Sequence, residues 1–548
     1  MNIRNCVLGC VFLAALGAAS VAPFFFAAGG GMAQAHDITI HWMRMIKFDE
    51  VLRSGVWFPR WLGGMNDGYG VATMIYYPPL FYYLAAGAHA VLGGWVASLA
   101  AVAMLTASAS GLCFYFYVRL FIDRTPALVA SAAYLLLPYH LIDLYHRGAF
   151  PELIAFVWMP LVMYGFTKAV WRTTGSSIVL SGAAFALLIV THPPMAYLFS
   201  ICLAVYAAAW SGAAKNLKPG LIAVTVGALG AGLAAFYAVP AVLETGYARQ
   251  TVTEQFKYPE SYIASLLSSG GFFGMLGVAA VVTASLLIVF AMMGPPENSS
   301  GRVAWTGWVL AGAFALLLMT PACAVLTRFL PRFESIAFSW RSLAILTMAV
   351  SVLAGTALQR VTEDGRRARA RIVFGMAAGA VVFSVAASAA ASNLRVAFDP
   401  PARYVEEEFL PISDSKTAAA IPIETMGGAT ARASMLEWKP QERLISTRSS
   451  EQFILNVATY DFPGWTARID GEPAGLRRNE NAGVISIEAP AGEHVLRLTF
   501  ENTPVRRRAA QISMVSVVVC AVLLAGSFWP AARALFGRRN WRSGGIVA

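Results

Sequence analysis

Long runs of apolar residues, interrupted by short polar loops, make up most of the chain. A helix needs about 20 apolar residues to cross a bilayer core of about 30 Å. The runs therefore predict an α-helical polytopic membrane protein with about twelve spans. The expected spans are 7–28, 95–118, 126–141, 152–167, 178–191, 195–211, 219–241, 272–293, 303–320, 337–358, 372–391 and 510–530. Ala33-Gln34-Ala35 resembles a signal-peptidase site. The run before it is longer than the apolar core of a signal peptide, so we interpret it as a retained first helix.

The pattern changes to short alternating runs near the C-terminus. FILNVATY (453–460), WTARIDG (465–471), VISIEA (484–489) and HVLRLTFE (494–501) alternate apolar and polar residues between glycine-containing turns. This pattern predicts a C-terminal antiparallel β-sandwich outside the membrane. We expect it to occupy 392–508, with 392–430 as a lead-in linker. Residues 430–505 are expected to fold when expressed alone, because Tyr460, Phe462 and Trp465 provide a local apolar core. Residues 509–548 would form a last span and a basic tail.

Composition agrees with a membrane protein and excludes other classes. Hydrophobic residues make up 57% of the chain and charged residues 13%, against about 45–50% and about 25% in soluble proteins. This excludes a soluble enzyme, a disordered chain and a nucleic-acid-binding domain. The net charge of +11 is what cytoplasmic loops rich in Lys and Arg produce. The six cysteines show no paired spacing and predict neither disulfides nor a zinc site.

Basic residues in short loops predict the orientation. The loops expected in the cytoplasm contain Arg4, Arg119, Arg124, Lys168, Arg172, Lys215, Lys218, Arg302, Arg366–Arg371 and Arg538–Arg542. This assignment requires that residues 79–93 lie in the outer interface instead of crossing the membrane. The first loop, 29–94, then lies outside, as do the segments 138–152 and 242–270.

The first outer loop offers the clearest candidate chemistry. Asp37, His41 and Arg44 recur at helical spacing and share one face of a short helix. An unpaired carboxylate at a membrane interface is unfavourable. We therefore expect Asp37 either to pair with another side chain or to take part in function. An amphipathic surface helix explains Lys47, Asp49, Glu50 and Arg53 equally well.

The second outer segment, PYHLIDLYHRGAFPE (138–152), concentrates His140, Asp143, His146, Arg147 and Glu152. Such a group at the mouth of a bundle could bind an anion or a metal. The alternative is a solvated loop in which Pro151-Glu152 opens the next helix, where acidic residues are favoured. His192, beside Pro193-Pro194, either faces the same cavity or is structural.

Several motifs resemble the GT-C superfamily of integral-membrane glycosyltransferases, which use polyprenyl-phosphate-linked sugars. The motifs are an acidic residue just past the first helix, Tyr-Pro-Pro-Leu opening an interfacial helix, and a second acidic loop. HDITIHW, GVWFPRW, NDGYG, IYYPPLFYYL, HRGAFPELIAF, FSWR and the terminal YDFPGWTARIDG and APAGEHVLRLTF resemble one bacterial branch. That branch is called YfhO-like or 6-pyruvoyl-tetrahydropterin synthase-related.

The resemblance implies roles for individual residues. Asp37 would be the general base or a metal ligand, and Asp143 or Glu152 the second acid. The paired Asp-x-Asp of oligosaccharyltransferases is missing, which leaves a divalent metal, Mg²⁺ or Mn²⁺, an open question. Arg60, Arg147 and Arg341 are candidates for binding the lipid phosphate; for Arg341 the alternative is an arginine that snorkels beside Trp340. The other expected substrate-binding residues are His36, His41, Tyr69, Tyr77, His146 and His192, the tyrosines being equally explained as headgroup anchors.

The resulting prediction is a membrane glycosyltransferase in the bacterial inner membrane, acting on its outer face. Its partners would be a polyprenyl-phosphate-linked sugar, membrane lipid and a glycan, lipid or protein acceptor, with no nucleic acid. Two alternatives stay open: a transporter or flippase for a lipid-linked glycan, and a non-catalytic scaffold. The spans are nearly free of charge at their centres, whereas a transporter is expected to bury ionisable residues near mid-membrane.

Overall fold

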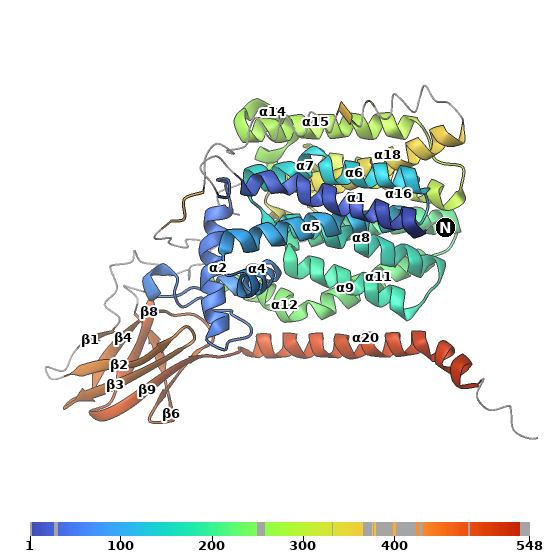
Figure 1. Cartoon of the computed structure of the whole chain (residues 1–548). Coiled ribbons are helices and arrows are strands. Elements are labelled where there is room, and N and C mark those ends of the chain that lie inside the picture. The colour runs from blue at the N-terminus through green and yellow to red at the C-terminus, as the bar shows by residue number, and fades with distance from the viewer. Residues whose placement is uncertain are drawn as a thin grey trace, which may run out of the picture.

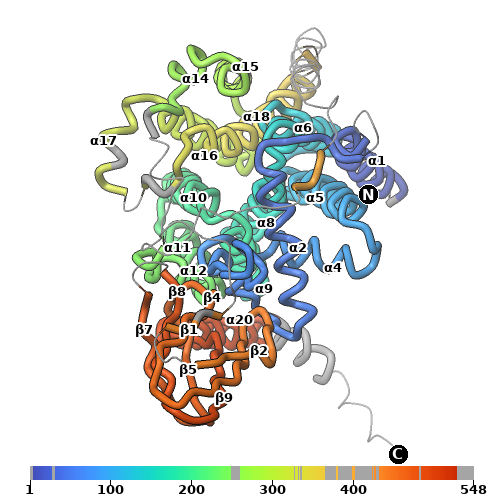
Figure 2. Tube along the Cα trace, turned by 90° about the vertical axis from the view of Figure 1, so that its left-hand side faces the viewer, coloured from blue at the N-terminus to red at the C-terminus, as the bar shows by residue number. Residues whose placement is uncertain are grey.

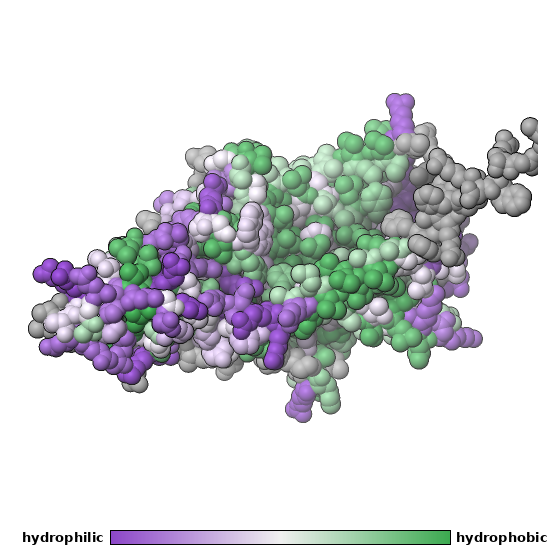
Figure 3. Space-filling model, turned by 90° about the horizontal axis from the view of Figure 1, so that it is seen from below, coloured by the Kyte–Doolittle hydropathy of each residue, from purple (hydrophilic) through white to green (hydrophobic). Residues whose placement is uncertain are grey.

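The protein consists of a helical bundle with a β domain at one end (Figure 1). The computed structural model describes residues 3–26, 31–248, 258–330, 333–364, 375, 378, 379, 398–401, 423–426, 431–479 and 483–537. An apolar band covers the bundle, and polar residues gather over the β domain (Figure 3). The molecule therefore has the surface of a membrane protein with one water-exposed domain.

Long apolar helices run side by side through the bundle. They are α1 (Ile3–Val21), α5 (Trp95–Val118), α6 (Arg124–Leu136), α8 (Phe150–Trp171), α9 (Gly175–Thr191), α10 (Pro193–Ala214), α11 (Lys218–Leu233), α15 (Gly271–Met292), α16 (Ser299–Leu318), α18 (Ser342–Glu363) and α20 (Pro504–Gly537). Every residue in the most apolar stretch of α18 is buried, which places this helix in the interior.

Within the described residues, nine helices are long and apolar enough to cross a membrane, or ten if one bent pair counts as a span. Two of the twelve expected spans account for the difference. Residues 178–191 fall within α9, which is too short to be counted as a span but packs against α8 and α11. Residues 372–391 lie almost wholly outside the described residues.

The span expected at 219–241 is broken. It consists of α11 and α12 (Ala235–Leu243), which meet at an angle of 80°. The break frees backbone groups that would otherwise be hydrogen-bonded within a helix, and α20 supplies their partner. Ser513 Oγ donates to Gly232 O at 3.1 Å and accepts from Phe236 N at 2.9 Å. Side chains of a neighbouring helix commonly satisfy such groups inside a membrane.

The contacts between loops distinguish two ends of the bundle. At the first end, Asn298 Nδ2 donates to Phe121 O, and Arg360 pairs with Glu297 at 3.3 Å. This end therefore carries the predicted basic loops around residues 119–124, 302 and 360. The runs 366–371 and 538–542 lie outside the described residues.

The opposite end carries the β domain and two helices that lie across the bundle (Figure 2). These are α2 (Ile38–Arg53) and α4 (Leu80–Leu92). With 13 residues, α4 is about 20 Å long at about 1.5 Å per residue and is too short to cross a bilayer. The short helix α3 (Thr73–Tyr76) precedes it.

The β domain consists of two antiparallel sheets. One has the strand order β1-β4-β8-β7 and the other β2-β3-β9-β5-β6. The strands are β1 (Ile423–Met426), β2 (Arg432–Lys439), β3 (Glu442–Ser449), β4 (Phe453–Tyr460), β5 (Trp465–Ile469), β6 (Glu472–Ala474), β7 (Leu476–Arg478), β8 (Val484–Ala489) and β9 (Gly492–Phe500). The predicted sandwich is confirmed. The expectation of a linker over 392–430 is wrong in one part, because β1 pairs with β4.

The core of the β domain is shared with the first outer loop. Trp61 is fully buried and contacts the rings of Phe462, Trp465 and Phe500 at centroid distances of 5.3–6.1 Å. Tyr460 N also donates to Tyr69 O at 3.1 Å. The local core that the sequence predicted for 430–505 is thus completed by residues nearly 400 positions earlier in the chain.

Candidate active site

Three carboxylates converge on Arg147 at the end of the bundle that carries the β domain. Arg147 Nη1 lies 2.7 Å from Asp143 Oδ1 and 2.6 Å from Glu152 Oε2, and Nη2 lies 3.5 Å from Asp37 Oδ2. Asp143 and Glu152 are fully buried, and Arg147 nearly so. We call Asp37, Asp143, Arg147 and Glu152 the acid cluster.

The backbone brings the members of the acid cluster together. Asp143 and Arg147 are the first and last residues of one π-helical turn, a geometry that is frequent at functional sites. The amide of His36 donates to His146 O at 3.0 Å, and that of Asp37 to Arg147 O at 2.6 Å. This seats the start of α2 directly on the π-helical turn.

Gly148, which follows the turn, is required for this approach. Its φ of +64° is a left-handed conformation that glycine adopts at little cost. A Cβ at this position would lie 3.0 Å from Ala35 Cβ. The acid cluster therefore depends on a close backbone contact between two segments that lie over 100 positions apart in the chain.

Glu152 connects the acid cluster to three further helices. Tyr139, in α7 (Pro138–Ile142), donates to Glu152 Oε1 at 2.5 Å. His192 Nε2, between α9 and α10, lies 3.6 Å from Glu152 Oε2. Arg341 Nε, at the start of α18, lies 4.0 Å from the same oxygen. Glu152 also occupies the first turn of α8, as the alternative of a solvated loop expected, but Asp143 and Glu152 are fully buried and not solvated.

Asp37 is the member of the acid cluster with the most access to solvent, its side chain being 25% exposed. Its Oδ1 lies 2.7 Å from Nδ1 of the exposed His36. Burial raises the pKa of Asp37, but the hydrogen bond from His36 and the charge of Arg147 outweigh it and lower the pKa to about 2. In turn, the hydrogen bond to Asp37 raises the pKa of His36. The two side chains form a coupled pair at the surface of the cluster.

The rest of the expected α2 face lies beside this pair. His41 is buried and its Nδ1 lies 3.2 Å from the Tyr82 hydroxyl. Burial lowers its pKa to about 3, so the imidazole is neutral at pH 7. The Arg44 guanidinium is also buried and lies 4.4 Å from the centre of the Tyr77 ring.

The acid cluster does not fit a divalent metal. Among the described residues, no group of three or more His, Cys, Asp and Glu side chains is arranged to hold a metal ion. The carboxylates of Asp37, Asp143 and Glu152 point at the Arg147 guanidinium, which takes the position between them that a cation would need. The cationic partner of these acids is part of the chain.

Most of the residues predicted from the sequence meet here, but three do not. Arg60 donates to Asn502 beside the β domain, and Tyr69 stacks on Tyr460. His146 contributes its backbone to the cluster, while its ring lies 6.0 Å from that of Phe272. Sequence reasoning missed Tyr139, although Tyr139, Asp143 and Arg147 follow one another at intervals of four residues.

Several solved membrane glycosyltransferases are similar in fold at low sequence identity. The arabinofuranosyltransferase AftD from Mycobacteria is 15% identical with a TM-score of 0.44, covering 70% of this chain and 27% of that one. An oligosaccharyltransferase of Archaeoglobus fulgidus, in complex with Zn and sulfate, is 16% identical with a TM-score of 0.39 over 72% and 54%. A complex of the oligosaccharyltransferase AglB from this organism with an inhibitory peptide and a dolichol-phosphate is 14% identical, with a TM-score of 0.40 over 72% and 56%.

This chain thus spans little more than half of the oligosaccharyltransferase and a minor part of AftD. No curated protein sequence matches it. A family of membrane proteins described as containing a 6-pyruvoyl-tetrahydropterin synthase related domain matches residues 74–397, which is more than half of the chain. The branch that the sequence motifs indicated is confirmed: the chain belongs to the 6-pyruvoyl-tetrahydropterin synthase related family of membrane proteins.

Proposed function

We propose that this protein is a membrane glycosyltransferase that moves a sugar from a polyprenyl-phosphate donor to an envelope acceptor. The observation that carries the proposal is the acid cluster, in which one carboxylate, that of Asp37, reaches the surface while its partners are buried. Acceptor activation needs a group that can take a proton at the surface of the protein. The donor needs cations for its phosphate. The surface carboxylate of Asp37 and the cations Arg147 and Arg341 all lie in or beside the acid cluster.

The Asp37–His36 pair would take the proton of the acceptor hydroxyl. A carboxylate with a pKa of about 2 stays ionised at pH 7 but is a weak base by itself, because general bases work best with a pKa near the working pH. His36 has a pKa raised by Asp37 and an exposed ring. We infer that Asp37 orients His36 and that the pair together accepts the proton.

Arg341 is the best candidate to bind the donor phosphate. Arg147 already contacts three carboxylates, which neutralise its positive charge. Arg341 Nε has no hydrogen-bond partner among the described residues, and the guanidinium stands 4.0 Å from Glu152. A developing phosphate charge could therefore be stabilised there.

The alternatives explain fewer observations. The charged side chains that the described part of the chain buries, such as Asp143, Glu152, Glu244 and Arg506, gather at the end of the bundle that carries the β domain. A transporter would be expected to hold such groups near mid-membrane. A scaffold would have no evident need to gather buried ionisable side chains around one guanidinium, since burying charge is costly even when it is paired.

The proposed site faces outward. The basic loops around 119–124 and 302 lie at the opposite end of the bundle, and such loops are cytoplasmic by the positive-inside rule. In a bacterium, the acid cluster and the β domain within 392–508 would then lie on the outer face of the inner membrane.

The test is mass spectrometry of envelope glycolipids and glycoproteins from cells with and without the gene. We expect one glycan to be lost on deletion and restored by the wild-type gene. A gene carrying Asp37→Asn should fail to restore it, although the protein is present in the membrane. A glycan profile unchanged by deletion would contradict the proposal.

A further inference from the structure

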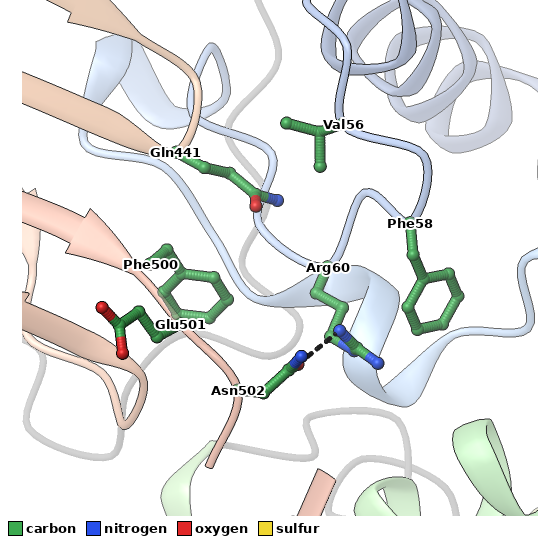
Figure 4. A pocket seen from close by; sticks show the side chains of 7 residues that line it. All are labelled: Val56, Phe58, Arg60, Gln441, Phe500, Glu501 and Asn502. Atoms are coloured by element: carbon green, nitrogen blue, oxygen red, sulfur yellow. Dashed lines mark hydrogen bonds between the residues drawn. The ribbon is translucent and has the colours of Figure 1, made fainter. Parts of the chain in front are cut away.

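A pocket of about 390 Å³ lies between the first outer loop and the membrane-facing end of the β domain. Figure 4 shows Phe58 and Arg60 on one wall, and Gln441, Phe500 and Asn502 on the other. Its size is typical of pockets that bind small molecules, about 300–1,000 Å³. It is formed by residues other than those of the acid cluster.

The two walls of the pocket are fixed to each other. Arg60 Nη1 donates to Asn502 Oδ1 at 2.7 Å, which joins the loop to the end of β9. At Gly63 a Cβ would lie 2.5 Å from Pro440 O, so the loop backbone rests on the β2–β3 turn. That turn is held in place by Phe500 N, which donates to Gln441 O at 3.0 Å. The pocket is therefore preformed.

The polar groups in the pocket include hydrogen-bond donors and the Arg60 guanidinium, which forms no ion pair with a carboxylate among the described residues. Glu244, which is paired with Arg506, acts on Arg60 only from a longer distance. Gln441 Nε2 is buried and has no partner among the described residues. The described contacts of Arg60 are with the neutral Asn502 and with the Phe58 ring, 4.1 Å from the guanidinium carbon. Burial lowers the pKa of Arg60 to about 10, so it is still charged at pH 7. The carboxylate of Glu501 points away from Arg60 (Figure 4).

These features favour a particular kind of ligand. A desolvated guanidinium pairs best with a carboxylate or phosphate, and the unpartnered Gln441 amide needs an acceptor oxygen. Phe58 and Phe500 add apolar surface to the lining, although the guanidinium groups of Arg60 and Arg506 lie over one face of each ring. The apolar surface that is left can contact the C–H groups of a sugar ring.

We infer that this pocket binds an acidic sugar residue, one that carries a carboxylate or a phosphate on a pyranose ring. The anionic group pairs with Arg60, and a ring oxygen or hydroxyl accepts from Gln441 Nε2. Its assignment to the acceptor glycan rests on the proposed function, whereas the binding itself does not. Arg60, which the sequence suggested as a ligand of the donor phosphate, thereby belongs to a second site.

The test is saturation-transfer-difference NMR on the full chain in detergent, with four probes compared. They are methyl β-D-glucuronide, glucose 1-phosphate, methyl β-D-glucoside and inorganic phosphate. We expect one or both acidic sugars to bind at least tenfold more tightly than the neutral glucoside and than phosphate. The first two probes distinguish a carboxylate from a phosphate as the anionic group.

Two variants and a control locate the binding. Gln441→Glu has nearly the same shape but places a negative charge opposite the anion, and Arg60→Gln removes the cation. Each should weaken binding of the acidic sugar at least tenfold. Arg477→Gln, in an exposed pair with Glu488 on the other sheet, should change nothing.

Three results would overturn the inference. These are equal binding of the neutral glucoside, phosphate binding as tight as that of the acidic sugars, which would indicate an adventitious anion only, or binding that both variants leave intact. The measurement is repeated in the Asp37→Asn protein, which should still bind. Loss of the proposed transferase activity and loss of this site can thus be told apart.

Discussion

Two buried arginines at the same end of the bundle are paired in different ways. Arg506, in α20, faces one carboxylate: its Nε lies 2.9 Å from Glu244 Oε2, and its remaining nitrogens donate to Pro463 O and Glu501 O. Thr503 Oγ1 donates to the second oxygen of Glu244 at 2.6 Å. Charge and hydrogen bonds are balanced at this joint between the β domain and the bundle.

Arg147 instead faces three carboxylates, and Asp143 Oδ2 has no hydrogen-bond partner among the described residues. A balanced ion pair such as Glu244–Arg506 can be explained by its structural role alone. The acid cluster instead joins three carboxylates through one guanidinium, with Arg341 4.0 Å from Glu152 and His36 2.7 Å from Asp37. Ionisable side chains concentrated in this way suggest a chemical use. The difference leads us to treat Glu244–Arg506 as structural and the acid cluster as the active site.

The largest effect is expected from removing Arg147. Arg147→Met would leave the buried carboxylate of Asp143 without the cation that it contacts, and that of Glu152 with Arg341 at 4.0 Å. Breaking a buried pair in this way costs about 3–5 kcal/mol. Thermal unfolding in detergent, followed by tryptophan fluorescence, measures the loss. The loss should shrink at low pH, where protonation removes the repulsion. Arg172→Met, an exposed arginine at the other end of the bundle, is the control and should leave stability unchanged.

The next largest effect is expected on the rate of turnover. Asp37→Asn keeps the shape of the side chain but removes its charge, and loss of a general base costs about 10²–10⁴-fold in rate. Because the lowered pKa means that the ionised carboxylate stabilises the fold, Asp37→Asn should also cost some stability, and turnover is compared at a temperature where both proteins stay folded. The measurement is sugar transfer by the purified protein. Asp49→Asn is the matched control, since Asp49 lies on the same helix and pairs with Arg53; equal loss in both variants would argue against a catalytic Asp37.

The Glu244–Arg506 pair should behave in the opposite way. Either Arg506→Met or Glu244→Gln alone leaves a buried partner and should destabilise the protein, by about 3–5 kcal/mol for the uncompensated charge. Replacing both residues together should recover most of that loss, as it does for other buried pairs. Sugar transfer by the doubly substituted protein should stay within a few-fold of wild type. A large loss of transfer at full stability would show that this joint also takes part in the reaction.

Local patterns allowed much of this fold to be predicted. β4 and β8 have the predicted bounds, because short strand-like runs bounded by turn residues are a local signal that needs no tertiary information. The one-face spacing of Asp37, His41 and Arg44 placed them on α2 for the same reason. The bend between α11 and α12 could not be predicted, since it depends on Ser513, nearly 280 positions away.

The members of the acid cluster were proposed from the sequence as a set of residues but not as an arrangement. Loop position and residue type identified Asp37, Asp143, Arg147 and Glu152. That Arg147 stands between the acids depends on the π-helical turn and on Gly148, neither of which periodicity reveals. Arg60 lies away from the acid cluster, which the sequence did not show, because membership of the first outer loop does not reveal which way that loop turns. Its contact with Asn502 spans 442 positions.

The smallest expected effect is a shift in the pH profile. It tests whether the Asp37 carboxylate acts on the reaction through His36. The hydrogen bond and charge of Asp37 raise the pKa of His36. If neutral His36 accepts the proton, turnover falls as pH drops through that raised pKa, because the protonated ring can no longer act as a base. In Asp37→Asn the pKa of His36 should return toward its ordinary value, so the acid limb of the residual activity should move to lower pH. The acid limb of the activity profile of Asp49→Asn should lie at the same pH as that of the wild type. An acid limb at the same pH in Asp37→Asn would rule out His36 as the titrating group and leave Asp37 to act alone.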